Sequence, residues 1–160
     1  MIAKIMKKMI MSSQGNQHDI QHFMKVWTYA KTIGELENLN LEQQLILEIA
    51  AITHDIACPL CREKYGNTNG KYQEQEGTMM VVEFLKEFEL TNEQLNRIVY
   101  LVGHHHTLQQ IDGLDYQILI EADYLVNADE SHYSMENIKN FKERIFQTKT
   151  GTELLEAIYL

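Results

Sequence analysis

The sequence is poor in proline, cysteine and basic residues. Its 160 residues include one proline, two cysteines and 14 Lys and Arg against 23 Asp and Glu, which gives a net charge of −9. Two cysteines are too few for a disulfide scaffold and fit a reducing compartment, so we expect a cytoplasmic protein. Binding to a nucleic acid polymer or an anionic membrane needs clustered Lys and Arg, so neither partner is expected. A small phosphate ester held at a metal ion is compatible with this charge, because the cation supplies the local positive charge.

Long apolar runs are also missing, since none approaches the ~20 residues that a membrane helix needs. Three lysines interrupt the apolar start of the chain and no small-residue cleavage site follows, which argues against a signal peptide. We expect residues 1–16 to be an N-terminal extension or a frayed start, and residues 17–160 to form one domain. A chain of this length buries roughly two-thirds of its unfolded surface, which is enough for a single core.

Helical periodicity runs through most of the sequence. Apolar residues recur at three- and four-residue steps in the segments 20–33, 45–52, 79–88, 98–102 and 116–128. No run of alternating Val, Ile or Thr predicts a strand. We therefore expect an all-α fold, a single compact helical bundle of about six to seven helices.

Capping residues and turn residues predict where some of these helices begin and end. The predicted starts are an N-cap at Asn40 and capping boxes at Thr91 with Gln94 and at Thr150 with Glu153. Residues 58–70 contain the only proline and a Gly/Asn-rich run, so we expect them to form the longest loop of the domain.

The positions of certain histidines and aspartates are the most informative feature. His54 and Asp55 follow the apolar segment 45–53, Asp123 lies within the most apolar helix, and His22 shares an inward stripe of the first helix. An ionised Asp among apolar groups costs several kcal/mol unless it is paired, hydrogen-bonded or bound to a metal. Two imidazoles and two carboxylates from three helices would suit a divalent ion such as Fe, Mn or Zn.

Each member of this set also has an ordinary interpretation. A single histidine such as His22 is more often a core or surface residue than a ligand. The dipeptide His18-Asp19 repeats the His-Asp pattern, and we interpret it as the first turn of a helix, where Asp favours the positive end of the dipole. The set of four is much less expected by chance than any one member.

A second cluster is the run His104-His105-His106 at the end of the fourth predicted helix. Its ordinary interpretation is a polar helix end, where a protonated imidazole complements the dipole. At 100° per residue at most two of the three can serve one site, and His105 follows the apolar stripe, with His104 beside it. Glu76 begins the third predicted helix and is either an ordinary first-turn acid or the carboxylate of a second metal position.

Three segments that carry the first set resemble a known family. Residues 19–33 (DIQHFMKVWTYAKTI), 50–57 (AAITHDIA) and 120–125 (IEADYL) resemble the HD superfamily of metal-dependent phosphohydrolases, which is named for the dipeptide His54-Asp55. The resemblance covers roughly residues 18–130 and is that of a small single-domain, bacterial-type member. It implies a bundle of five or more helices around a metal site.

Residues 102–107 also resemble the binuclear branches of this superfamily, which include cyclic-dinucleotide and dinucleoside-polyphosphate hydrolases. His104 and His105 match the adjacent pair that helps to hold a second metal in those branches. Another histidine usually lies near the start of the third helix, where residues 72–77 of this chain contain none. Glu76 is the expected substitute. The extended signature of the branch that degrades cyclic di-GMP is absent.

The resemblance implies a metal-dependent phosphohydrolase, a phosphomonoesterase or phosphodiesterase that acts on a nucleotide or dinucleotide through metal-activated hydroxide. His54 and Asp55 would be catalytic, with Asp55 bridging two ions. The expected ligands are His22, His54, Asp55 and Asp123 for a first divalent ion (Fe, Mn, Co, Ni, Zn or Mg) and Glu76, His104 and His105 for a second.

Contacts with the substrate are harder to predict. The candidates are Arg62, Lys64, Lys71 and His106, although the three basic residues also fit an ordinary solvated loop. Two other functions stay open: a di-iron oxygenase of the HD-like type and a non-catalytic domain that binds a nucleotide. A homodimer is a further option.

Cys58 and Cys61 form half of a zinc motif, but no second pair or nearby His pair completes it. We expect two reduced thiols without a role in the site.

Overall fold

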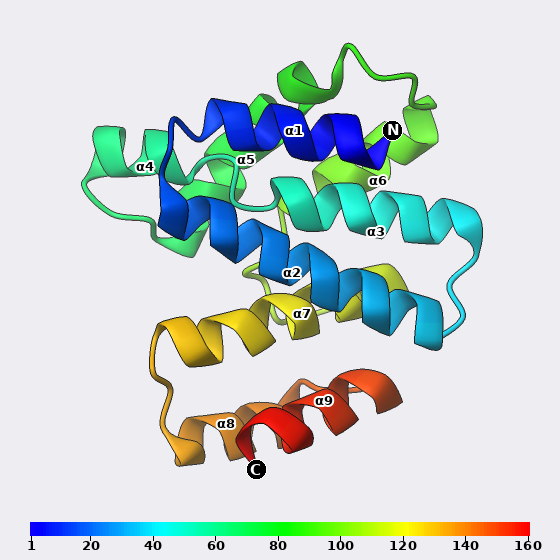
Figure 1. Cartoon of the computed structure of the whole chain (residues 1–160), viewed down its shortest axis with the longest axis vertical. Helices are drawn as coiled ribbons and strands as arrows, with labels where there is room; N and C mark the ends of the chain where they lie inside the picture. Colours follow the sequence, from blue (N-terminus) through cyan, green and yellow to red (C-terminus); the bar gives the residue numbers. More distant parts are fainter.

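The computed structural model describes all 160 residues and consists of nine helices without a strand (Figure 1). The helices are α1 (Ile2–Ser12), α2 (Gln17–Leu36), α3 (Leu41–Thr53), α4 (Cys58–Tyr65), α5 (Gly70–Leu85), α6 (Asn92–Val102), α7 (Leu114–Glu130), α8 (Met135–Arg144) and α9 (Lys149–Tyr159). The predicted all-α class is confirmed. The expected number of helices is too low, because α1, α4 and α8 were not expected. The apolar residues of α8 are few, and Ile138 is the only one that is buried.

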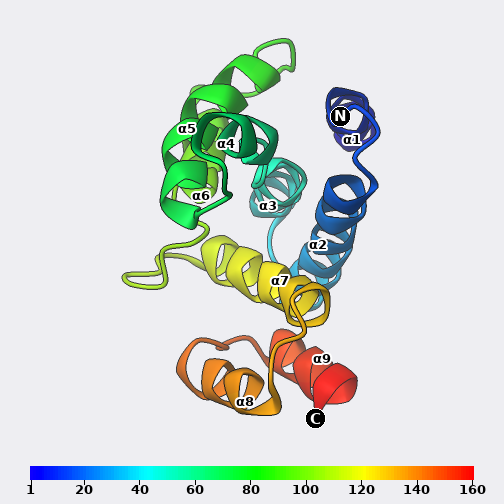
Figure 2. The same ribbon diagram turned by 90° about the vertical axis from the view of Figure 1, so that its left-hand side faces the viewer.

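Helices α2, α3 and α7 form the centre of the bundle. α2 packs against both α3 and α7, and α3 also packs against α1, α6 and α7. α5 packs between α4 and α6, whereas α8 and α9 lie together beyond α7 (Figure 2). The three central helices are the ones that carry His22, His54 and Asp123, so the core packing itself brings these side chains together.

Two of the three predicted helix starts are confirmed. Asn40 and Thr91 each cap a helix through a complete capping box. The box predicted at Thr150 and Glu153 is wrong, because Thr148 is the N-cap of α9 and its hydroxyl accepts a bond from the backbone three residues further on. The backbone N–H of Thr150 is instead bonded to the carboxylate of Glu37 at 2.7 Å.

The loop predicted for residues 58–70 is also wrong for most of its length. Cys58–Tyr65 forms α4, in which Pro59 occupies the first turn, where a missing backbone N–H costs no helical hydrogen bond. The helix ends at Gly66, whose φ of 72° is left-handed and therefore suits glycine. Only residues 66–69 are irregular, and the longest loop is residues 103–113, between α6 and α7.

The start of the chain differs from the expected frayed segment. It forms α1, whose Ile5 and Met9 are buried in the core that α1 shares with α3. Lys8 joins α1 to the end of α5, because its ammonium group donates to the carbonyl of Phe84 at 2.6 Å and pairs with Glu87 at 2.9 Å.

One stretch, Leu41–Tyr65, is long and apolar enough to cross a membrane by length and composition. In the folded chain 72% of its apolar window is buried, as expected for a core helix.

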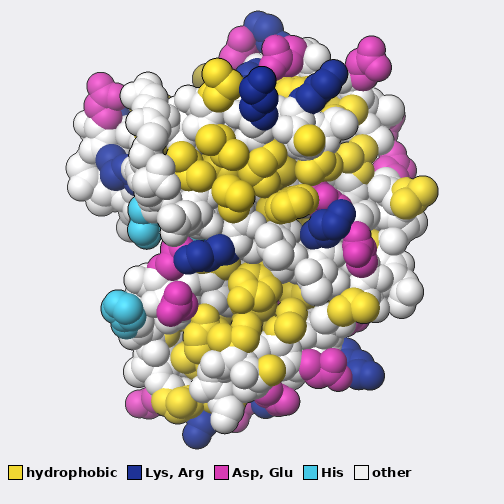
Figure 3. Space-filling model, in the orientation of Figure 1, with side chains coloured by type: hydrophobic (Ala, Val, Ile, Leu, Met, Phe, Trp, Pro, Cys, Tyr) yellow, Lys and Arg dark blue, Asp and Glu magenta, His cyan; other side chains and the backbone are white.

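A groove lined by Ile2, Met6, Ile10 and Trp27 lies between α1 and α2, and Figure 3 shows hydrophobic side chains gathered over these two helices. The homodimer stays a prediction.

A buried carboxylate holds α9 against α7. Glu121 on α7 is fully buried and accepts hydrogen bonds from the backbone N–H groups of Gln147 (2.7 Å) and Thr148 (3.0 Å) and from the side chain of Gln117 (2.8 Å). A Cβ atom at Gly151 would collide with this carboxylate, so glycine is what lets α9 begin so close to α7.

Replacing Glu121 by alanine should therefore destabilise the protein. The change leaves at least three buried donors without an acceptor, and each such donor costs about 1–3 kcal/mol. We expect the free energy of unfolding, measured with urea, to fall by about 3 kcal/mol or more. The exposed change Glu143→Ala on α8 is the control. An unchanged midpoint for Glu121→Ala would contradict the role of this carboxylate.

Candidate metal centre

His54 and Asp55 lie where α3 ends, at the edge of the core. His54 is fully buried, and its Nδ1 lies 2.8 Å from the carbonyl oxygen of Ala51. A carbonyl oxygen can only accept, so Nδ1 carries the hydrogen and Nε2 offers a free lone pair. The end of the helix thus sets both the position and the tautomer of this ring.

His22 and Asp123 approach the same point from α2 and α7. The Nε2 atom of His22 lies 3.2 Å from His54 Nε2, 3.2 Å from Asp123 Oδ1 and 3.3 Å from Asp55 Oδ2. His54 Nε2 lies 3.5 Å from Asp123 Oδ1 and 3.6 Å from Asp55 Oδ2. The four residues expected to hold the first ion therefore lie together, with their ligating atoms directed inward.

These separations are those of ligands around one ion. Metal–ligand bonds of about 2.1 Å place neighbouring ligands about 3.0 Å apart in an octahedron and about 3.4 Å apart in a tetrahedron. The observed range of 3.2–3.6 Å brackets the tetrahedral value. Two carboxylates and two imidazoles suit a divalent transition metal, so these four residues fit a metal ion of this kind.

The pKa values of the ligand residues also indicate a cation at this point. Burial alone would lower the pKa of His22, but hydrogen bonds to Asp123 and Glu130 and the charge of Asp55 outweigh burial and raise it to about 10. Burial would raise the pKa values of Asp55 and Asp123, yet the surrounding histidines hold both well below the usual range. The carboxylates thus stay ionised, and positive charge has to lie between them.

A second group adjoins the first. His105, at 2% exposure, faces the other oxygen of Asp55 at 3.4 Å, and its Nδ1 is bonded to the carbonyl of Val102 at 2.7 Å. Its Nε2 also lies 3.3 Å from the side-chain oxygen of Gln73. Asp55, His105 and His106 have ligand atoms close enough to hold an ion. The two oxygens of Asp55 therefore face two different groups.

Comparison with known families agrees with this arrangement. Residues 19–134 match the HD domain family. The chain belongs to the HD domain family. Proteins of this family bind divalent metals and most are metal-dependent hydrolases. The match includes every residue of both groups, whereas α1, α8 and α9 lie outside it. Searches of the curated proteins and of the solved structures found no match to this chain.

Two residues expected at the second position of the HD domain lie elsewhere. The carboxylate of Glu76 accepts hydrogen bonds from Lys64 (2.6 Å) and Tyr65 (2.5 Å), so it faces α4. The ring of His104 stacks on Tyr100 at 4.1 Å, and its Nδ1 is bonded to the carbonyl of the same residue. Neither belongs to the two groups, so the expected second ligand set is corrected at both residues.

Gln73 occupies the place that was expected for Glu76. α5 begins at Gly70, so its first turns, which include Gln73, face α6 and the centre. Gly77, one turn further on, lets α5 approach closely, since a Cβ there would lie 3.1 Å from Val102. The side-chain amide of Gln73 donates to the carbonyl of Thr68 at 2.7 Å, which fixes its oxygen toward His105.

The expected substrate cations are not at the site. Arg62 pairs with Asp19 and Lys64 with Glu76, while Lys71 is exposed on the first turn of α5. His106 alone lies close, with its ring 4.1 Å from that of His105. Arg62 and Lys64 lie on α4 and Lys71 on the first turn of α5, and none of the three lines the pocket that holds His105 and His106.

Sequence analysis also missed two residues that orient the ligands. Glu130 at the end of α7 accepts a hydrogen bond from His22 Nδ1 at 2.7 Å, which directs Nε2 inward. The amide of Asn127 donates to Asp123 Oδ1 at 2.9 Å. Both follow Asp123 at helical spacing, at four and seven residues, and this spacing was the signal available in the sequence.

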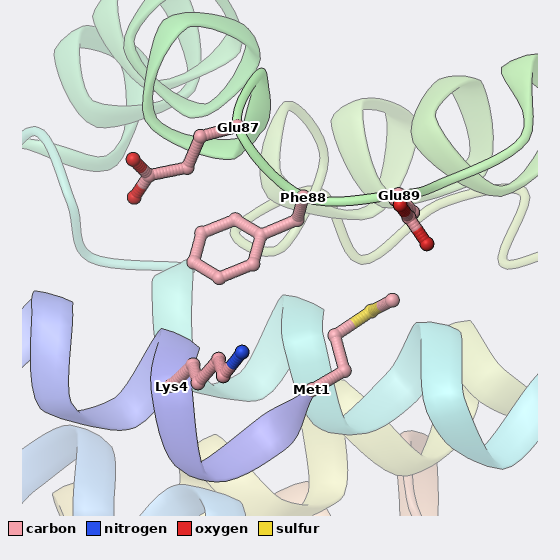
Figure 4. A pocket seen from close by; sticks show the side chains of 5 residues that line it. All are labelled: Met1, Lys4, Glu87, Phe88 and Glu89. Atoms are coloured by element: carbon pink, nitrogen blue, oxygen red, sulfur yellow. The ribbon is translucent and has the colours of Figure 1, made fainter.

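Other features lie outside the centre. Both cysteines are free and buried, and burial raises the pKa of each thiol, which keeps them protonated. A separate hollow lies between the start of α1 and the turn after α5, where Phe88 points between Met1 and Lys4 (Figure 4). It contains no histidine or cysteine and is not a candidate metal site.

Glu130→Gln should weaken metal binding without unfolding the chain. The amide cannot match the carboxylate as acceptor for His22, and the loss of such partners typically costs about 10–100-fold in metal affinity. We expect this rise in the Kd for Mn²⁺, measured by competition with a chelator. Glu143→Gln on exposed α8 is the control, and equal affinities of the two variants would contradict the role of Glu130.

Metal binding should also depend on pH. Because the pKa of His22 is raised to about 10, its ring holds a proton on Nε2 at neutral pH, and an ion has to displace that proton. Affinity should therefore rise with pH, and the Kd for Mn²⁺ at pH 8 should be about tenfold lower than at pH 7. Titrations in the two buffers measure this change, which a constant Kd would rule out.

Proposed function

We propose that this HD domain is a metal-dependent phosphohydrolase that cleaves a small phosphate ester in the cytoplasm. The observation that carries the proposal is the position of Asp55. One of its oxygens lies 3.3 Å from His22 Nε2 and the other lies 3.4 Å from His105 Nε2. A single carboxylate can thus serve two neighbouring positions, which is the arrangement of two-metal hydrolytic sites.

Charge balance favours two ions. The ligands include two carboxylates, Asp55 and Asp123, and the other ligand atoms are neutral nitrogens and an amide oxygen. One divalent ion would only cancel the two negative charges. Two ions would leave a net charge of +2, which matches the dianion of a phosphate monoester.

The residues have separate roles in this proposal. His22, His54 and Asp123 would hold the first ion, His105 and the oxygen of Gln73 would hold the second, and Asp55 would offer one oxygen to each. Divalent ions in such a site lower the pKa of bound water toward 7 and neutralise the phosphoryl oxygens. Glu130 keeps the ligand ring of His22 in the required tautomer.

The reaction is the hydrolysis of a P–O ester bond. Water forms a new bond to phosphorus, the bond to the ester oxygen breaks, and the leaving alcohol takes up a proton, which gives an alcohol and inorganic phosphate. His106 is the exposed member of the second group, so it would either join His105 as a ligand or contact the substrate. With no basic stripe at this site, the substrate is a small molecule rather than a nucleic acid polymer.

Asp55→Ala is the direct test. The change removes a ligand from both positions, so we expect loss of bound metal and loss of phosphate release to below about one-hundredth of the wild-type rate. Elemental analysis of protein purified without chelators should give a metal-to-chain ratio near two for the wild type. Asp129→Ala, an exposed change on α7, should leave both quantities unchanged.

The same measurements separate the competing functions. Oxygen uptake without phosphate release would favour the di-iron oxygenase, and tight nucleotide binding without turnover with Mn, Fe, Co, Ni or Mg would favour a regulatory domain. Retention of metal and phosphatase activity in Asp55→Ala would overturn the proposed function.

A further inference from the structure

A pocket of about 300 Å³ opens directly beside the metal centre. His105, Gln73 and Asp123 lie on its inner side, and the rings of Tyr124, Tyr133 and Phe141 line another side. A volume of this size is at the lower limit for small-molecule sites. It has room for one compact ligand.

The aromatic side is held in place by α8. Tyr124 stacks on Phe141 at 3.7 Å with the ring planes 10° apart, and its hydroxyl donates to the side chain of Asn137 at 2.6 Å. Phe141 and Asn137 lie outside the residues that match the HD domain family. The support from α8 therefore lies outside the family match, whereas Tyr124 and Tyr133 lie within it.

Tyr133 differs from its aromatic neighbours in being accessible. It is 37% exposed, whereas Tyr124 is 5% exposed and packed on one face by Phe141. The ring of Tyr133 lies 5.5 Å from that of Tyr124 and borders the pocket, so it offers a free surface to a flat ligand. Stacking on an exposed aromatic ring holds a nucleobase without hydrogen bonds that are specific to one base, because every base has a flat π face.

The charge of the pocket lining also limits which ligands fit. No Lys or Arg side chain lines the pocket. Arg62 is paired with Asp19, Lys64 with Glu76 and Lys142 with Glu156, and Lys71, two residues before Gln73, is exposed and does not line the pocket. Metal ions can hold one phosphate at the centre, but a second or third phosphate inside the pocket would meet no positive side chain of its lining.

We infer that the pocket takes a nucleoside monophosphate, with its phosphate at the metal centre and its base on Tyr133, and that it discriminates against nucleoside polyphosphates. The inference rests on the proposed function for the position of the phosphate. Tyr133 is then a residue that determines specificity rather than a catalytic one.

The test compares adenosine 5′-monophosphate, adenosine 5′-triphosphate and ribose 5-phosphate as substrates of the Mn²⁺-loaded protein. We expect kcat/KM for the monophosphate to exceed that for the triphosphate at least tenfold. Tyr133→Ala should lower kcat/KM for the monophosphate by about 10–100-fold, mainly through KM. It should leave ribose 5-phosphate, which has no base, within about twofold of wild type. Tyr133→Phe, which keeps the ring, should behave like the wild type.

Binding gives a second readout that does not need turnover. Calorimetry with adenosine 5′-monophosphate should show tighter binding to wild type and Tyr133→Phe than to Tyr133→Ala, with inorganic phosphate binding equally to all three. Without phosphate release from any substrate the proposed function fails, and this binding pattern still decides on the pocket. Equal use or binding of mono- and triphosphate, or equal losses on all ligands in Tyr133→Ala, would overturn the inference.

Discussion

Burying Asp55 and Asp123 among imidazole nitrogens is costly unless positive charge lies between them. Each ring has its Nδ1 bonded outward, to a carbonyl or to Glu130, so every Nε2 atom is directed toward carboxylate oxygens. Acceptors that face acceptors at 3.2–3.6 Å repel one another until a proton or a metal ion joins them. A metal ion removes this repulsion more completely than a proton does, because several ligand atoms can bind the same ion.

Different helices contribute different parts of the metal centre and its pocket. α2, α3 and α7 pack on one another and carry the first group of ligands, so the position of the ion is set by the largest part of the core. α5 and α6 add the second group, and the glycines of α5 allow the close approach that this needs. Tyr124 of α7, Tyr133 just after α7 and Phe141 of α8 form the aromatic side of the pocket. The ligands and most of the pocket lie within the residues that match the HD domain family, whereas Phe141 lies outside them.

Predictions from the sequence succeeded where the signal was periodic and buried. His22 and Asp123 were predicted at inward positions of apolar helices and His54 and Asp55 at the end of another, and all four meet in the structure. Predictions failed where the start of a helix decides the direction of a side chain. Because α5 begins six residues before Glu76, that residue faces α4 and Gln73 faces the centre.

Hydrophobic periodicity and the identity of the buried polar residues determined the all-α class, the central helices and the first ligand group, because each depends on spacing along one helix. The sequence pattern could not reveal that Arg62 and Lys64 form ion pairs with carboxylates on neighbouring helices. Nor could it reveal that α8 returns to the pocket with Phe141. Those outcomes depend on how helices pack across the bundle, and only the tertiary structure decides which distant side chains meet.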